Sequence, residues 1–173
     1  LSMLGSTAAR YDDGRPGRTW RPLADTTLAP VISARQPIGW SSWQRGEDYY
    51  SEGLLIWLDA DSLIRERTDG RKSLDDFARN FFGVNDGDLG QLTYTFDDVV
   101  TELNKVLPFD WEPWLRQRVE QTNTHAPLDG FERGGYRLIF TEEPSAYFKK
   151  AESEFKYTEL SYSIGMSIEN NGD

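Results

Sequence analysis

Apolar side chains recur with helical spacing most clearly in residues 40–67, where an aromatic and acidic stretch runs into the longest helical pattern of the chain. Five apolar residues lie at offsets of zero, four, seven, eight and fourteen, the spacing of one helix face: Tyr50, Leu54, Trp57, Leu58 and Ile64. We therefore predict a long helix that begins near Gly46 and buries this face. Gly53 lies inside it; either a neighbour packs closely there, which we favour, or the glycine is merely tolerated.

Two shorter helices are predicted downstream, each from a capping signature at its start. Ser73 is followed three residues later by Asp76, and Thr95 by Asp98, which is close to the capping-box pattern. Gly83 should end the first of these helices. Its apolar face is dense enough for the centre of the domain and consists of Leu74, Phe77, Ala78, Phe81 and Phe82.

A further helix should begin after Asp110, which is a less clear N-cap. Pro113 is compatible with it only because a proline in the first turn costs no backbone hydrogen bond. The apolar side of this helix would be formed by Trp111, Trp114, Leu115 and Val119.

The two ends of the chain have different patterns. Residues 1–39 show no useful period, and we interpret them as a connecting arm anchored by Trp20 and Leu23. Residues 134–144 and 159–173 alternate like strands, and a helix opened by Pro144 lies between them. The predicted fold is thus mainly α, with four or five helices in residues 40–158 and a short β-containing tail from 159 to 173.

Composition narrows the classes of partner. The chain has 173 residues, with 29 acidic against 19 basic side chains, which argues against nucleic-acid or anionic-membrane partners. No stretch approaches the length of a membrane-spanning helix, and the first ten residues lack the pattern of a signal peptide. The absence of cysteine leaves the compartment undetermined. The abrupt start suggests that the chain was cut from a longer protein.

No complete catalytic apparatus is apparent in the residues. His125 is the only histidine, it lies in a loop, and the most economical interpretation is a surface residue. The His-Glu-x-x-His zinc motif, the nucleophile elbow and phosphate-binding glycine loops are absent. Residues 85–91 form an acidic turn cluster that fails the calcium-loop pattern, because neither register supplies the glycine and glutamate required. We therefore predict no metal site in this chain.

Several long strings nevertheless resemble a known family. GRTWRPLADTT, WSSWQRGEDYYSEGLLIWLDADSLIRE, SLDDFARNFFG and YTFDDVVTELNKVLPFDWEPWLRQRV are similar to the C-terminal part of the catalytic region of bacterial glycyl aminopeptidases, which are thermolysin-like gluzincin zinc peptidases. The resemblance is strong over residues 17–119 and looser beyond. It implies the helical subdomain of the peptidase followed by the start of a PDZ domain. The zinc ligands and the general base would then lie upstream, so this chain alone should be inactive.

The resemblance also implies roles for particular residues. Related aminopeptidases carry a Tyr-Glu-Lys-Gly string whose tyrosine stabilises the oxyanion opposite zinc, and YSEG aligns Tyr50 with it, with Tyr49 as its neighbour. Arg45, Glu47 and Asp48 would line the substrate groove, where a carboxylate could bind the free amino group of a peptide. The implied activity is release of small N-terminal residues such as Gly or Ala.

Simpler interpretations remain for each residue. Tyr50 on an apolar helix face could be a core residue, and the charges before it could be a solvated helix start. A non-catalytic peptide-binding module would use a groove of Trp40, Trp43 and Tyr49. A glycoside hydrolase fragment would pair Glu47 or Asp48 with another carboxylate.

Overall fold

The computed structural model describes residues 2–84, 87–88, 90–160 and 163–170, and this part of the chain is mainly helical with one small antiparallel sheet. The prediction of a mainly α fold with a β-containing tail is confirmed. The helices are α1 (Ser2–Asp12), α2 (Ala29–Ile32), α3 (Ser41–Gln44), α4 (Tyr49–Arg67), α5 (Leu74–Phe82), α6 (Phe96–Val106), α7 (Trp111–Val119), α8 (Asp129–Arg133) and α9 (Ala146–Phe155). No helix in the described ranges is long and apolar enough to cross a membrane.

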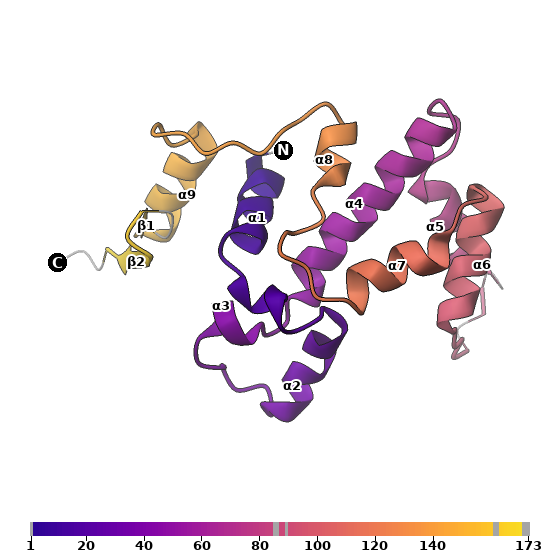
Figure 1. Cartoon of the computed structure of the whole chain (residues 1–173), viewed down its shortest axis with the longest axis horizontal. Helices are drawn as coiled ribbons and strands as arrows, with labels where there is room; N and C mark the ends of the chain where they lie inside the picture. The colour runs from indigo at the N-terminus through magenta and orange to yellow at the C-terminus, as the bar shows by residue number, and fades with distance from the viewer. Residues whose placement is uncertain (1, 85–86, 89, 161–162, 171–173) are drawn as a thin grey trace.

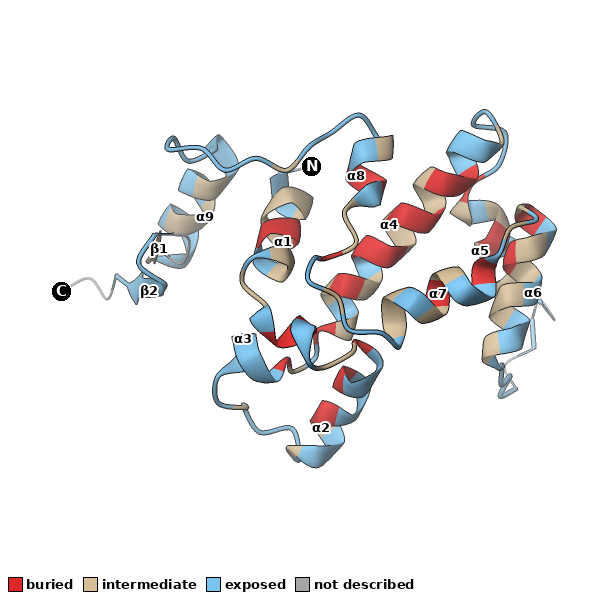
Figure 2. Cartoon of the chain, viewed as in Figure 1, coloured by how far each residue is buried: buried red, intermediate tan, exposed pale blue. Residues whose placement is uncertain are grey.

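Helix α4 is the central element, with α5, α6 and α7 on one side and α1 and α8 on the other (Figure 1). Two clusters of buried side chains lie on these two sides. The larger joins α4 to α5, α6 and α7 and comprises Leu23, Ile56, Ala60, Leu63, Ile64, Phe77, Leu103, Val106, Trp111 and Leu115. The smaller joins it to α1 and α8 and comprises Ala8, Leu55, Ala126 and Phe131. Buried residues accordingly follow the length of α4 (Figure 2).

The predicted core face of α4 is wrong in its first half. Ile64 is buried, but Tyr50 is 69% and Leu54 46% exposed, while Trp57 and Leu58 are only half-buried. The buried side instead includes the charged residues Glu52 and Asp59. The reason is tertiary, since arginines from other segments neutralise these two carboxylates and allow them to be buried.

The capping predictions are confirmed. Ser73 and Thr95 each accept a hydrogen bond from a backbone amide of the first helical turn, while Asp76 and Asp98 accept one from the N-cap amide in return. Helix α7 also forms where predicted, with Trp111 and Leu115 buried, although Asp110 makes no side-chain cap. These helix starts depend on contacts within four residues, which is why the sequence predicts them well.

The arm predicted for residues 1–39 contains regular helices that its sequence pattern did not indicate. Residues 1–39 contain α1, α2 and the short 3₁₀ helices η1 (Pro16–Thr19) and η2 (Ala24–Leu28). Leu23 is buried as expected, whereas Trp20 is 48% exposed and lies against Trp43. Helix α1 has weak apolar patterning, and it is held by the burial of Ala8 beside α4, a contact that its own sequence does not reveal.

The C-terminal part contains a hairpin but no strand in residues 134–144. Strands β1 (Tyr157–Leu160) and β2 (Met166–Glu169) pair antiparallel, with Thr158 opposite Ile168. Helix α9 is capped by the Ser145 hydroxyl, one residue after the predicted Pro144 opening. The expected boundary at residue 158 lies inside β1, so the hairpin begins before it.

Candidate functional site

The residues singled out by the sequence gather at the N-terminal end of α4. The backbone amide of Tyr50 donates to the carbonyl of Glu47, and that of Glu52 donates to the carbonyl of Asp48, which closes the first turn. Arg45 precedes this turn with a positive φ of 53°. The chain therefore bends sharply before the helix and brings Arg45 back against its first turn.

A network of buried charges underlies this turn. Asp48 accepts hydrogen bonds from Nε of Arg45 at 2.9 Å and from Nε of Arg15 at 3.3 Å, one to each carboxylate oxygen. Oε1 of Glu52 accepts from Nη2 of Arg45 at 2.5 Å and from Nη2 of Arg18 at 2.6 Å. We call these five residues the α4 anchor. It ties the first turn of α4 to the segment that follows α1.

Backbone carbonyls complete the α4 anchor. Arg18 also donates to the carbonyl of Tyr11 and, at 2.9 Å, to that of His125, while Arg45 donates to the carbonyl of Arg21 at 2.8 Å. A single buried arginine thereby holds three segments that are distant in the sequence. Such connections satisfy guanidinium donors that would otherwise be costly to bury.

Burial sets the electrostatics of this network. Desolvation raises the pKa of the Glu52 carboxyl, although the charges of Arg18 and Arg45 act in the opposite direction. Desolvation likewise lowers the pKa of Arg18, with the charge of Glu52 opposing it. Each charge is tolerated because its partner is present, so loss of one partner should cost more than the net benefit of the pair.

The geometry gives Arg45 and Asp48 structural partners within the chain, whereas their predicted contact with a substrate stays a prediction. Both are buried, and each engages partners within the α4 anchor. Asp48 directs both carboxylate oxygens at arginines, so its charge is already compensated within the α4 anchor. Of the three charged residues predicted to line a groove, Glu47 alone is exposed.

The two tyrosines lie in different environments. Tyr49 packs half-buried against the larger core cluster, while Tyr50 is 69% exposed. Their ring centroids are 4.5 Å apart. A hydrogen bond with the Tyr50 side chain raises the pKa of Tyr49. Tyr50 is therefore no core residue of this chain, and its phenol stands at the surface beside a firmly anchored turn.

The tryptophans do not join Tyr49 in one groove. Trp20 and Trp43 form a pair with centroids 6.0 Å apart, and the Trp20 indole donates to the carbonyl of Trp43. Trp40 is 82% exposed. These rings form an aromatic surface near α3, whereas Tyr49 contacts Tyr50.

A polar cavity of about 260 Å³ lies behind the α4 anchor. Arg18, Arg45 and Glu52 line one side, and the other side is formed by α7 and the loop that precedes α8. Tyr50 does not line this cavity. Within the described residues no group of three His, Cys, Asp or Glu side chains could hold a metal ion. His125 is exposed as predicted, and its Nδ1 lies 3.3 Å from Asp12.

Sequence reasoning missed Arg15, Arg18 and Glu52. A signal for them was present, because Asp48 and Glu52 lie four residues apart on one helix face, where like charges repel unless cations intervene. The positions of those cations, more than thirty residues earlier in the chain, had no such signal.

Models of known protein families do not match this chain, and a search of curated proteins finds no match to it. The resemblance to glycyl aminopeptidases thus remains a prediction from the quoted sequence strings.

Proposed function

We propose that this chain is part of a zinc-dependent aminopeptidase that releases small N-terminal residues from peptides, and that it supplies the helical wall of the cleft together with Tyr50. The observation that carries the proposal is the exposure of the Tyr50 side chain, 69%, on the first turn of α4. A tyrosine whose role is core packing is expected to be buried, whereas Tyr50 is exposed to solvent.

The α4 anchor supports a role in catalysis. A hydrogen-bond donor stabilises an oxyanion best when it is already fixed in place, because no reorganisation is then needed during the reaction. Ion pairs at Asp48 and Glu52 hold the residues before and after Tyr50. The Tyr50 hydroxyl would donate a hydrogen bond to the oxygen of the tetrahedral intermediate, and Glu47 would bind the substrate's amino group.

The described residues do not fit a zinc site. The proposal therefore assigns the zinc ligands to a part of the parent protein outside this chain, and no step of metal chemistry is assigned to the residues described above. The peptide substrate would bind between that part and the surface of α4 that carries Tyr50.

The test is Tyr50→Phe in the longer, zinc-containing protein. Loss of a donor used mainly in the transition state should lower kcat by about 10²- to 10³-fold and leave KM nearly unchanged. Tyr49→Phe is the matched comparison, since it removes the neighbouring hydroxyl. The proposal fails if Tyr50→Phe keeps more than about a third of the wild-type kcat, far above the expected residual.

A second candidate, a non-catalytic peptide-binding module, is favoured by the exposed indole of Trp40 and the nearby Trp20–Trp43 pair. In that case Trp40→Ala would weaken peptide binding, and the longer protein would show no zinc-dependent peptidase activity. The glycoside hydrolase alternative is less well supported, because Asp48 already engages two arginines and would not be available as a second carboxylate.

A further inference from the structure

A segment with the pattern of a strand follows α8, and it pairs with no strand in the part of the chain that the structure describes. The turn after α8 closes with a hydrogen bond from the amide of Tyr136 to the carbonyl of Phe131, with Gly135 at a positive φ of 79°. Among the described residues, the backbone groups of residues 137–139 then have no hydrogen-bond partner. Their N–H and C=O groups are available to a further strand, as at the edge of a sheet.

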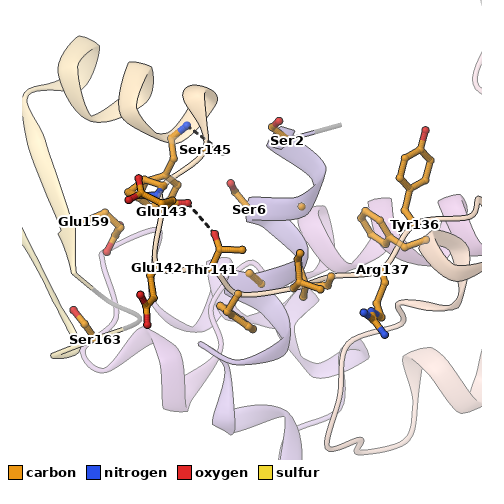
Figure 3. Close-up of a pocket in the computed structure, with 18 of the residues that line it drawn as sticks. Ser2, Ser6, Tyr136, Arg137, Thr141, Glu142, Glu143, Ser145, Glu159 and Ser163 are labelled. Carbon is orange, nitrogen blue, oxygen red and sulfur yellow. Dashed lines mark hydrogen bonds between the residues drawn. The ribbon is translucent and has the colours of Figure 1, made fainter.

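The side chains of this segment alternate as in a strand. Tyr136 and Arg137 project to opposite sides of the backbone (Figure 3). Leu138 is half-buried against the smaller core cluster, whereas Ile139 is 61% exposed. Leu138 thus packs the segment against the smaller core cluster, while the side chains on either side of it remain exposed and could contact a ligand. Strand addition requires free main-chain groups and pockets for alternate side chains, and this segment offers the first beside a cavity that can provide the second.

A cavity of about 900 Å³ lies beside the segment. Its walls are the segment itself, one face of α1, the start of α9 and the β1 end of the hairpin (Figure 3). The face of α1 contributes only small side chains: Ser2, Gly5, Ser6 and Ala9. A methyl group added at Gly5 would meet nothing within 4 Å, so the space is open down to the helix backbone. The cavity is therefore large enough for a backbone with alternating side chains.

The charge of the cavity specifies its occupant. Among the described residues that line it, Glu142, Glu143 and Glu159 are acidic and only Arg137 is basic. Glu143 has a loose partner in Lys149 at 3.7 Å, and Glu142 forms no ion pair with any other described residue. The whole chain carries a net charge of −10, so a second copy would be repelled. A basic partner is favoured by the same electrostatics.

We propose that this cavity binds an extended polypeptide segment of a partner protein, with Lys or Arg at alternate positions, as a strand added to residues 137–139. Main-chain hydrogen bonds to the segment provide the binding geometry, and the acidic side chains select basic residues. This inference does not depend on the proposed peptidase activity, because the α4 surface with Tyr50 does not line the cavity.

The first test titrates the isotopically labelled chain with a six-residue peptide of alternating Val and Lys, capped at both ends. We expect saturable NMR shifts in residues 137–139 and slowed hydrogen exchange at the alternate amides of Arg137 and Ile139, which face the same edge. A peptide with Glu in place of Lys should not bind. A Lys peptide N-methylated at alternate residues, which lacks the donors of one edge, should bind at least several-fold more weakly.

Two pairs of variants complete the test. Ile139→Pro removes an amide donor from the segment and should abolish binding, while Thr93→Pro, at an exposed position outside any helix or strand and away from the cavity, should not. Glu142→Gln should weaken binding of the Lys peptide by about two- to five-fold, as for an exposed ion pair. Glu154→Gln removes the same charge from a part of α9 that does not line the cavity and should have little effect.

Several results would overturn the proposal. These are equal binding of the Glu and Lys peptides, shifts located away from residues 137–139, or unchanged binding after both N-methylation and Ile139→Pro. Formation of dimers through this segment, detected by light scattering, would assign it to a second copy instead. If Ile139→Pro unfolds the chain, the N-methylated peptide alone decides the question.

Discussion

Nη2 of Arg18 lies 2.6 Å from Oε1 of Glu52, and both side chains are almost completely buried. This ion pair joins the segment after α1 to the first turn of α4, the turn that carries Tyr50. The position of the proposed catalytic tyrosine therefore depends on a residue distant in the sequence.

Replacing Glu52 should show how strongly the α4 anchor stabilises the fold. Glu52→Gln keeps the shape but leaves the guanidinium groups of Arg18 and Arg45 buried without their shared anion, so we expect a loss of about 3 to 5 kcal/mol in unfolding free energy. Urea denaturation of the variant and the wild type measures this change in unfolding free energy. Glu112→Gln breaks an exposed pair with Arg116 and should cost at most about 1 kcal/mol. Equal effects of the two changes would contradict a central role for the anchor.

Replacing two glycines by alanine should change the stability of the fold in opposite directions. A Cβ at Gly130 would lie 2.8 Å from the backbone nitrogen of Asp59, so α8 could not keep its close approach to α4. We expect Gly130→Ala to destabilise the chain by about 1 to 3 kcal/mol. At Gly53 nothing lies within 4 Å, contrary to the close packing we favoured, and Gly53→Ala should stabilise by up to about 1 kcal/mol. Thermal unfolding of both variants checks the pair, and a stabilising Gly130→Ala would be inconsistent with this packing.

The cap of α6 should make stability depend on pH. Hydrogen bonds from the backbone amide and then the hydroxyl of Thr95 lower the pKa of Asp98. Because the folded-state pKa lies below the unfolded one, this stabilisation is present above the ordinary carboxyl range and is lost as the pH falls through the lowered value. Asp98→Ala should therefore be less stable than Asp97→Ala near neutral pH, and the difference should shrink at about pH 2. A difference that does not change with pH would argue against this assignment.

Zinc should not be retained by this chain alone. The sequence contains one histidine and no cysteine, and the described residues form no cluster of metal ligands. After dialysis we expect far less than one zinc per chain by elemental analysis, and no hydrolysis of a glycyl anilide. Stoichiometric zinc, or hydrolysis that a chelator abolishes, would place a metal site within the chain. Either result would refute the proposal that the zinc ligands lie in another part of the parent protein.

Local rules were enough to predict much of the helical architecture. The capping boxes at Ser73 and Thr95 involve groups within four residues of each other, so the sequence contains the whole of each interaction. The helix that carries Tyr50 was likewise predicted from its period. The exposure of Tyr50 was not predicted. A helical period shows that a helix has an apolar stripe, but it does not show which other segments cover that stripe.

Tertiary structure alone decided which charges are buried and which strand pattern is paired. Glu52 and Asp59 enter the core because Arg18 and Arg118, both remote in the sequence, neutralise them, and a helical period counts such residues as polar. The segment at 137–139 has a strand pattern, yet a strand needs a partner for its backbone groups, and none of the described residues provides one. The sequence determined the local conformation of these elements, while long-range contacts determined their neighbours and their exposure to solvent.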